Sequence, residues 1–354
     1  MINDLPNLTN PVCAVPHSHN DYIVMGHGSG GGMTHNLIQK VFAPHFTNSS
    51  LDANNDFGIV ENTGKNRLAI STDAHIVSPL FFPGGDIGRL AVCGTVNDVS
   101  MSGAEVIGLT ASFIIEEGFP IKDLERIAIS MSIAAKEAGV KIVSGDTKVV
   151  ERGKADGVFI STSGIGYIPE GTDIGGANAK PGDAVIISGT VGDHGMAVLT
   201  ARGDLGLETQ IRSDVAPLNG LIHSLLLEIP DVHVLRDPTR GGLATTLNEI
   251  ATQSEVNITI NEASIPLNPE VSSTCELLGF DPLYVANEGK LILILPDTMA
   301  EKALRILKNH QYGREAVKIG MVLPDPQKRV LLRTRIGSNR ILDVMTGEML
   351  PRIC

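Results

Sequence analysis

The sequence predicts an α+β fold in two domains, and three observations support this prediction. The chain has 354 residues, about twice the usual length of a single domain. Hydrophobic residues make up 42% and charged residues 19%, a balance typical of packed globular proteins rather than disordered chains. Strand-like apolar runs and helix-like periodic segments occur in both halves, and loops rich in glycine and aspartate follow several strands.

The first half contains strands and helices in mixed order. A short apolar run at Tyr22–Met25 precedes a glycine-rich loop, and a helical stretch follows from Met33 to about Phe46. Asp86 is expected to cap a helix that ends near Ser102, and Gly139 is expected to end a second helix. The other elements expected here are strands at Arg67–Ser71, Val106–Ile115, Lys141–Ser144 and Val158–Tyr167 and a helix at Ile121–Ala138.

The second half begins after the turn-rich stretch Pro169–Gly182. The expected elements are strands at Ala184–Ser188, Ile258–Ile260, Leu291–Leu295 and Arg329–Arg333, with helices ending near Arg202 and at Leu243–Thr252 and Thr298–Asn309. Periodicity stops near Leu342, which predicts a mobile tail. The expected division is therefore a glycine-rich segment (1–45), a first domain (46–168), a second domain (182–341) and the tail (342–354).

Composition argues against several classes of function. The net charge is −12, and nine Phe, four Tyr and no Trp leave few aromatic side chains, which argues against nucleic-acid binding. Apolar runs are too short to span a membrane, and the N-terminus lacks the pattern of a secretion signal. The four cysteines show no CxxC pairing. We therefore expect a soluble cytoplasmic protein that binds neither nucleic acid nor membrane.

The loop Gly26–Gly32 follows an apolar run and opens a helix. Consecutive glycines allow several backbone N–H groups to point at one anion, so its central residues are candidate phosphate ligands. These residues are Gly28, Ser29, Gly30 and Gly31. The loop lacks the Gly-Lys-Ser/Thr ending of a P-loop, and it is also consistent with a flexible connector.

Four aspartates form a second candidate group. Asp73 and Asp146 are expected just past strands, Asp98 lies in a helix of small residues, and Asp56 precedes them. Carboxylates gathered at strand ends suit Mg²⁺, which prefers oxygen ligands and bridges phosphates. Lys148 then becomes a candidate phosphate clamp or proton-transfer amine. Taken singly, the aspartates also fit turns or caps, and the lysine a solvated strand end.

Three further features remain ambiguous by themselves. Glu288 lies between two apolar runs, where it fits either a turn or a site. The stretch Arg236–Gly242 carries charges before a helix and could bind phosphate or ribose, or merely cap that helix. Cys354 ends the chain, either as an accidental thiol or as the carrier of a one-carbon group on a swinging arm.

Motifs along nearly the whole chain support a resemblance. The matching stretches are Gly26–Gly32, Ser78–Gly88, Cys93–Gly103, Ser144–Val150, Ser188–Gly195, Arg236–Gly242, Ala286–Lys290 and the ending Pro351–Cys354. Together they resemble the HypE family of carbamoyl dehydratases in hydrogenase maturation, within the aminoimidazole ribonucleotide synthetase-like (PurM-like) superfamily. The ending Pro-Arg-Ile-Cys distinguishes this family from the rest of the superfamily. The stretch Cys13–Asp21 is less typical and receives no role.

This resemblance implies a fold and a set of ligands. The fold would be a two-domain PurM-like ATP-binding fold, in which an N-terminal mixed sheet dimerises, a C-terminal α/β sandwich follows and a flexible tail ends the chain. The segment 1–45 would cover the phosphates of Mg-ATP. ATP would be held by Gly28, Ser29, Gly30, Gly31, Asp98, Asp146, Asp237, Thr239 and Arg240, and Mg²⁺ by Asp56, Asp73, Asp98 and Asp146.

The resemblance also implies a reaction. The carbamoyltransferase HypF would place a carbamoyl group on Cys354, ATP would activate the amide oxygen, and loss of phosphate would leave a thiocyanate. Lys148 or Glu288 would be the base, and the cyanide would pass to iron held by the HypC–HypD complex. Two alternatives remain: a related ATP-dependent phosphotransferase or synthetase that acts on a free small molecule, and a non-catalytic carrier or scaffold.

Overall fold

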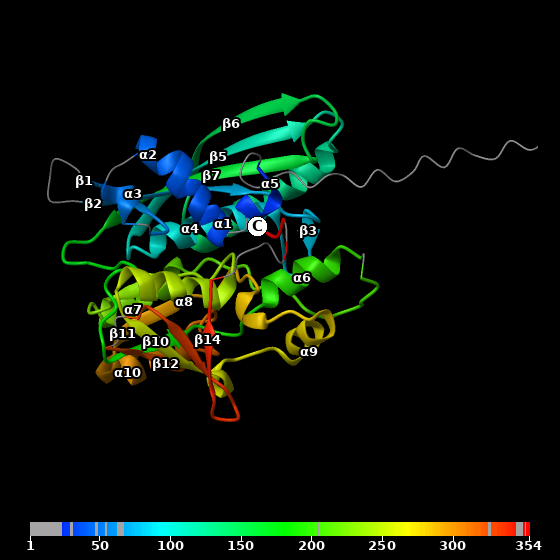
Figure 1. Ribbon diagram of the computed structural model, residues 1–354. Coiled ribbons are helices and arrows are strands. Elements are labelled where there is room, and N and C mark those ends of the chain that lie inside the picture. The colour runs from blue at the N-terminus through cyan, green and yellow to red at the C-terminus, as the bar shows by residue number, and fades with distance from the viewer. Residues whose placement is uncertain are drawn as a thin grey trace, which may run out of the picture.

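Each half of the molecule is built on one large sheet (Figure 1). The computed structural model describes residues 23–28, 31–46, 49–53, 55–61, 67–203, 205–324, 327–344, 350 and 352–354. Ser29, Gly30 and the stretch Cys13–Asp21 lie outside these residues. In the described part, no helix is both long and apolar enough to cross a membrane.

The N-terminal half contains a five-stranded sheet in the order β1-β2-β7-β5-β6. Its elements are η1 (Met25–Gly28), α1 (Gly32–Leu37), η2 (Ile38–Phe42), α2 (Ala43–Phe46), α3 (Ser49–Asp52), β1 (Gly58–Glu61), β2 (Arg67–His75), β3 (Phe81–Phe82), β4 (Gly85–Asp86), α4 (Ile87–Ser100), β5 (Glu105–Glu116), α5 (Ile121–Ala138), β6 (Ile142–Val150) and β7 (Val158–Ile168). The predicted helical stretch up to Phe46 is confirmed as α1, η2 and α2 in succession.

Helices α4 and α5 form as their sequences predict. The Asp86 carboxylate accepts hydrogen bonds from the backbone N–H groups of Gly88 and Arg89, at 2.8 and 3.0 Å, which caps α4. Gly139 ends α5 in the left-handed conformation, with a φ of 70°. Helix α4 packs on the inner face of the sheet, where alternate residues of β7 are buried.

The C-terminal half contains a seven-stranded sheet in the order β14-β13-β10-β12-β8-β11-β9. Its elements are β8 (Asp183–Ile187), α6 (Asp193–Ala201), α7 (Asn219–Glu228), β9 (Val234–Arg236), α8 (Gly242–Gln253), β10 (Asn257–Asn261), η3 (Glu262–Ser264), α9 (Pro269–Leu278), η4 (Pro282–Tyr284), β11 (Ile292–Pro296), α10 (Asp297–Asn309), β12 (Val317–Leu323), β13 (Val330–Arg333) and β14 (Asn339–Leu342). Strand β8 is buried throughout because α7 and α10 pack on one face of the sheet and α8 on the other.

The predicted ends of two strands are wrong. Strand β2 continues through Asp73 to His75, and β6 runs from Ile142 through Asp146 and Lys148 to Val150. The apolar runs are shorter than the strands because the polar residues beyond them still pair with neighbouring strands. Asp73, Asp146 and Lys148 therefore lie within strands, so their side chains are assigned to one face of the sheet or the other.

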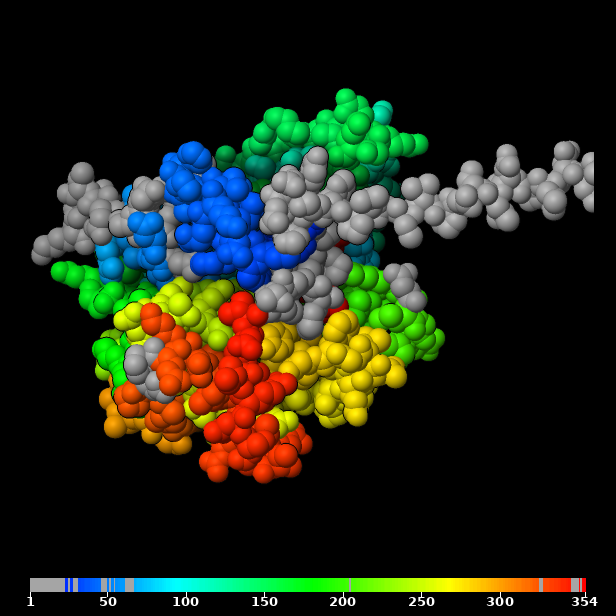
Figure 2. Space-filling view, viewed as in Figure 1, coloured from blue at the N-terminus to red at the C-terminus, as the bar shows by residue number. Residues whose placement is uncertain are grey.

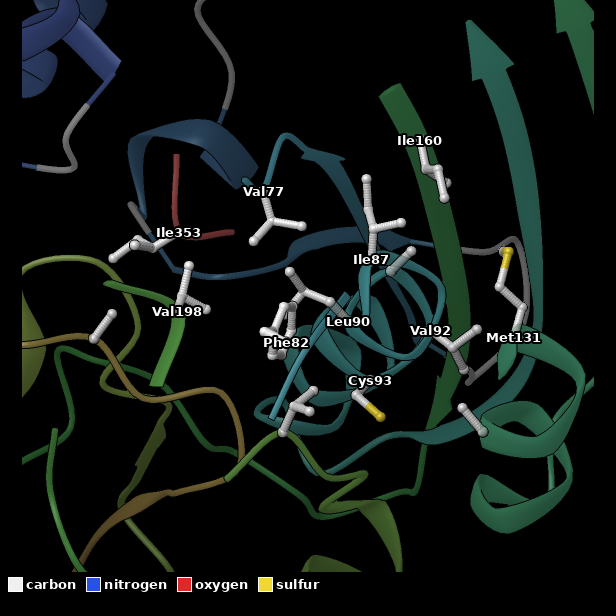
Figure 3. Packing of buried hydrophobic residues seen from close by; sticks show 14 of the residues in the cluster. Val77, Phe82, Ile87, Leu90, Val92, Cys93, Met131, Ile160, Val198 and Ile353 are labelled. Carbon is white, nitrogen blue, oxygen red and sulfur yellow. The ribbon is translucent and has the colours of Figure 1, made fainter. Parts of the chain in front are cut away.

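The two halves share their hydrophobic cores. One cluster joins residues of the N-terminal half such as Leu90 to Val198 of α6 and Ile353 of the tail (Figure 3). A second cluster joins Val99 of α4 to Leu218, which immediately precedes α7. Figure 2 shows the halves in close contact along this junction. The junction is therefore a packed interface, and polar groups buried in it are held by both halves.

Candidate active site

Two carboxylates from different elements meet on the inner face of the N-terminal sheet. Asp73 projects from β2, and Asp98 projects from α4, which packs on that strand. The hydroxyl of Ser71 donates a hydrogen bond to Asp98 Oδ2 at 2.7 Å, and the hydroxyl of Thr95 lies 3.4 Å from Asp73 Oδ2. The hydroxyl donors fix the carboxylates without neutralising their charge.

The position of Asp98 raises its pKa well above the usual range. Burial is the main cause, followed by the negative charges of Asp73, Asp237 and Asp56. Two of these neighbours belong to the N-terminal half and Asp237 to the C-terminal half, so the acidic cluster spans the junction. A bound cation or bound protons stabilise a cluster of this kind, because they reduce the repulsion between its carboxylates.

Asp56 is paired with a buried arginine from the C-terminal half. Arg236 Nε lies 2.5 Å from Asp56 Oδ2, and Arg236 Nη2 donates a hydrogen bond to Glu249 at 2.7 Å. Burial raises the pKa of Asp56 to about 6, against the opposing effect of Arg236. The guanidinium therefore connects the two halves through a buried ion pair.

Two glycines determine the conformation of the loop before α8. Gly241 and Gly242 have φ values of 79° and 61°, and a Cβ on Gly242 would lie 2.6 Å from the carbonyl oxygen of Leu283. Only glycine fits such a close approach in a left-handed conformation. The loop thereby buries Asp237, whose pKa is raised well above the usual range by burial and by Asp56, and leaves Arg240 exposed.

Glu288 is buried on the other side of this loop. Its backbone N–H donates a hydrogen bond to Asp214 Oδ1 at 3.0 Å, and only 5% of its surface is exposed. Burial raises its pKa well above the usual range, and Asp237 and Asp214 raise it further, whereas Arg240 lowers it. Glu288 is therefore a buried carboxyl group whose hold on a proton depends on the charges nearby.

The end of the chain reaches this group of side chains. The backbone N–H of Ile76, just after β2, donates a hydrogen bond to the backbone oxygen of Cys354 at 2.9 Å. The pKa of Arg240 is raised by Cys354 first and then by Asp73, Glu288 and Asp98, against burial. Arg240 thus lies among the tail and the acidic groups of both halves.

Cys354 differs from the two other cysteines that the structure describes. Burial raises the pKa of the Cys93 thiol to about 12 and that of Cys275 to about 11. None of the three is in a disulfide, and only Cys354 is partly exposed. It is therefore the reactive candidate among the cysteines in the described ranges.

Asp146 does not join the acidic cluster within one protomer. Asp73 aligns with Thr162 of β7, which aligns with Ala111 of β5. Ala111 aligns in turn with Gly145, the residue before Asp146. Because neighbouring residues of a strand point to opposite faces, Asp146 lies on the face opposite Asp73. Within one protomer the four aspartates therefore do not form one cluster, and the role of Asp146 as a Mg²⁺ ligand stays a prediction.

Lys148 lies on that same outer face. Its Nζ is 2.7 Å from Asp146 Oδ2, and both side chains are more than half exposed. The hydrogen bond from Lys148 is the main reason that the pKa of Asp146 is lowered. The sheet separates Lys148 from the cleft that contains Glu288, so the two candidate bases, Lys148 and Glu288, do not meet within one protomer.

The carboxylates of Asp73 and Asp98 suit a divalent cation that takes its remaining ligands from phosphate and water. Among the described residues, no three His, Cys, Asp or Glu side chains stand ready to hold a metal ion. Asp73 and Asp98 offer hard oxygen donors with mutually unfavourable charge, which suits Mg²⁺. Mg²⁺ commonly takes one or two protein carboxylates and completes its shell with phosphate oxygens and water.

The glycine-rich loop is described only at its two ends. Gly28 ends η1, and Gly31 is buried and precedes α1, where its carbonyl accepts a hydrogen bond from His35 N–H at 3.1 Å. Ser29 and Gly30 lie outside the described residues. The phosphate-binding role of this loop remains a prediction. Thr239 is half-buried beside Arg240, and its role as an ATP ligand also remains a prediction.

Sequence reasoning missed three side chains that organise the site. Arg236 holds Asp56, Asp214 accepts the hydrogen bond from the Glu288 backbone, and His194 lies against the tail. Arg236 and His194 occur inside stretches that matched the family motifs. The motifs therefore marked their positions but did not indicate what these side chains do. Asp214 lies in a segment without periodicity, where the sequence offered no signal.

Comparison with known proteins assigns a family to this arrangement. The N-terminal domain model of AIR synthase related proteins matches residues 54–168, and the C-terminal domain model matches residues 180–333. Carbamoyl dehydratase HypE from Cupriavidus necator is 55% identical over 332 residues, which cover 94% of this chain and 95% of the relative.

Solved structures agree with these matches. A crystal structure of a HypE–HypF complex contains a chain with 54% identity and a TM-score of 0.83, covering 87% of this chain and 99% of that one. A structure of HypE in complex with ATP has 50% identity and a TM-score of 0.79, covering 93% and 98%. The predicted PurM-like fold is confirmed. The chain belongs to the carbamoyl dehydratase HypE family of hydrogenase maturation enzymes, built from the two AIR synthase related domains.

Proposed function

We propose that this enzyme uses ATP to dehydrate a carbamoyl group on its own Cys354 to a thiocyanate. The carbamoyl oxygen would attack the γ-phosphorus of ATP, releasing ADP. Loss of the phosphate and of the two nitrogen-bound protons would then leave a carbon–nitrogen triple bond on sulfur. In sum, thiocarbamate and ATP give thiocyanate, ADP and phosphate.

One observation carries this proposal. The tail brings Cys354 beside Arg240, at the junction where Asp73, Asp98 and Glu288 also lie. A relative of 50% identity is a HypE bound to ATP, which supports the same nucleotide for this chain. A thiol, a cationic side chain and a buried carboxyl group are the parts that the reaction requires.

Glu288 is our candidate base within the same protomer. Burial and the neighbouring carboxylates raise its pKa, so its ionised form accepts a proton readily, and the positive charge of Arg240 favours that ionised form. Arg240 would oppose the negative charge that develops on the activated oxygen, because it lies among Cys354 and the acidic groups of the junction. Asp214 orients Glu288 through the backbone.

Asp73 and Asp98 would hold Mg²⁺ together with Asp56 when nucleotide is bound. When bound there, Mg²⁺ would offset charge on the phosphates of ATP. The chain's own contribution is a set of buried carboxylates whose mutual repulsion is relieved by a cation.

The outer face of the N-terminal sheet supports a homodimer. Strand β6 is the last strand of the sheet, and on the face that carries Asp146 and Lys148 the apolar side chains of Ile70 and Ile114 are 39% and 44% exposed. Exposed apolar side chains on a sheet face favour association with a second copy. In such a dimer Asp146 and Lys148 would serve the cleft of the partner subunit, because the sheet keeps them from their own.

We propose HypF as the carbamoyl donor and the HypC–HypD complex as the cyanide acceptor. A relative of 54% identity was crystallised as a HypE–HypF complex, which supports the first partner. We place the reaction in the cytoplasm. The free thiols of Cys93, Cys275 and Cys354 agree with a reducing compartment.

The decisive experiment is the mass of the C-terminal peptide after incubation with HypF, carbamoyl phosphate and ATP. We expect one carbamoyl addition on Cys354 followed by the loss of one water. Cys354→Ala should bind ATP normally and give no cyanated product. An unmodified Cys354 in the presence of active HypF and bound ATP would instead favour a synthetase for a free small molecule or a scaffold.

A further inference from the structure

The tail is held by its main chain against the segment that follows β2. Ile76 N–H donates a hydrogen bond to the backbone oxygen of Cys354 at 2.9 Å, and Ser78 N–H donates one to the carbonyl of Arg352 at 3.1 Å. Two alternate backbone donors of this segment therefore meet two alternate residues of the tail. The bonds read the backbone of the tail and not its side chains.

His194 binds the tail residue between these two. Its Nε2 lies 2.5 Å from the carbonyl oxygen of Ile353, which can only accept, so Nε2 carries the proton. Its Nδ1 lies 2.8 Å from Ser213 Oγ and then accepts from that hydroxyl. Burial lowers the pKa of His194, which agrees with a neutral ring. The imidazole packs edge-on against Phe82, with ring centres 5.5 Å apart.

Arg202 completes the contacts with the main chain. Its Nε donates a hydrogen bond to the carbonyl of Ser78 at 3.0 Å, and its Nη2 donates one to the carbonyl of Arg352 at 3.2 Å. The Arg202 guanidinium therefore connects the segment Ile76–Ser78 to the tail. Arg352 has a φ of 59°, which is unfavourable for residues other than glycine, so these contacts must outweigh a local backbone cost.

The side chain of Ile353 enters the core. It is 6% exposed and belongs to the same apolar cluster as Val77, Phe82 and Val198 (Figure 3). The side chain of Arg352 pairs instead with Asp156 near the surface. Ile353 is therefore the tail side chain whose shape the protein can test by burial.

We propose that Ile76–Ser78, His194 and Arg202 form a peptide-binding seat, here called the tail seat, which recognises residues 352–354. Its ligand class is a short peptide with a branched apolar residue before a terminal cysteine. His194 and Arg202 act as positioning residues that hold the tail by its carbonyl groups, and Ile353 determines specificity. The proposal refines the proposed function, because the cysteine so positioned is the one that would carry the carbamoyl group.

The test measures how fast iodoacetamide alkylates Cys354 in the full chain, by the mass of the peptide released by cleavage after Lys328. We expect His194→Leu to speed alkylation about fivefold, the usual effect of losing one buried hydrogen bond. His194→Gln keeps an N–H donor and should restore most of the protection. Ile353→Asp should speed alkylation about tenfold or more, whereas Ile353→Val should change it little.

Matched surface variants control for unspecific effects. His223→Leu replaces an exposed histidine, and Ile336→Asp replaces an isoleucine that is 91% exposed, so both should alkylate like the unaltered protein. Melting curves show which variants remain folded. Ile353 stands one residue from the chain end, so its variants keep the test open if the His194 variants do not fold.

Equal alkylation rates in folded His194→Leu, Ile353→Asp and the unaltered protein would overturn the proposal. Alkylation requires neither ATP nor HypF, so its outcome is independent of the dehydration reaction. A protected Cys354 that never becomes cyanated would refute the proposed function and leave the tail seat. If Cys354 is cyanated but its alkylation rate is the same in all these variants, the proposed function stands and the tail seat is refuted. In a carbamoylated enzyme, His194→Leu should slow a single turnover about fivefold without weakening ATP binding.

Discussion

The inner and outer sides of the N-terminal sheet meet similar ion pairs in opposite environments. On the inner side, at the junction, Asp56 of the loop before β1 and Arg236 of β9 form a buried ion pair, and burial raises the pKa of the carboxyl group to about 6. On the outer face Asp146 and Lys148 form an exposed pair, and the lysine lowers the pKa of its partner. The same pair of charges thus serves a proton- or cation-binding cluster in one place and a solvated surface in the other.

The largest expected effect is on activity, and it tests whether Lys148 on the outer face serves the active site of the partner subunit. Lys148→Ala and Glu288→Ala should each lower activity by about 10²-fold or more, as expected for proton-transfer groups. If Lys148 serves the other protomer, mixed dimers of the two variants contain one intact site. Randomly assembled mixtures should then recover about a quarter of the normal activity. The activity of co-expressed variants is the measurement.

The alternative result is equally clear. If Lys148 acts in its own protomer, each site in a mixed dimer lacks one group, and mixtures stay as inactive as the separate variants. A control mixture of each variant with the unaltered protein shows that subunits exchange. Full activity of the Lys148→Ala variant by itself would place Lys148 outside the reaction.

The next effect compares the stability of the two ion pairs. Arg236→Met should lower the free energy of unfolding by about 3–5 kcal/mol, because Asp56 and Glu249 lose their buried cation. Lys148→Met should leave the denaturant midpoint unchanged, since exposed pairs contribute little. Chemical denaturation at pH 7 measures both. Similar midpoints for the two variants would contradict the contrast between the faces.

The smallest effect is the response to pH. The pKa of Asp56 is raised from 3.8 to about 6, so the folded state holds a proton that the unfolded state has released. That contribution to stability is lost as pH rises from about 4 to about 6. Raised pKa values at Asp98 and Asp237 extend the loss to higher pH. The cluster then becomes an ionised site for a cation.

Mg²⁺ should therefore raise the melting temperature by a few degrees at pH 8 and much less at pH 5. Asp98→Asn should reduce both the pH dependence and the Mg²⁺ effect. Asp146→Asn should leave the pH dependence of stability above about pH 4 unchanged, because a carboxyl group with a lowered pKa is ionised in both states at such pH values. Calorimetry at the two pH values tests this, and an Mg²⁺ effect that is greater at pH 5 would contradict it.

Local signals in the sequence predicted local structure well. The Asp86 cap of α4 and the Gly139 end of α5 depend on contacts within a few residues, and both are confirmed. Strand ends were less predictable, because Asp146 and Lys148 belong to β6 through pairing with β5, more than thirty residues earlier. One misplaced strand end also misassigned which face those two side chains occupy.

The site was predictable in its residues and unpredictable in its contacts. Asp73, Asp98, Glu288 and Arg240 were identified from motifs, and the structure gathers them at the junction. Arg236 and Asp56 are 180 positions apart in sequence, so no periodicity could indicate their ion pair. His194 and the tail are similarly remote, at 159 positions.

The shared apolar clusters have a consequence for how the molecule comes apart. Because each of two clusters contains residues of both halves, heat should melt the halves in one cooperative transition and not in sequence. The cleft lies at the junction between the two halves, and the halves separate there when the protein unfolds. Any ligand that touches both sides of the joint therefore protects the entire chain against unfolding, including parts far from the chemistry.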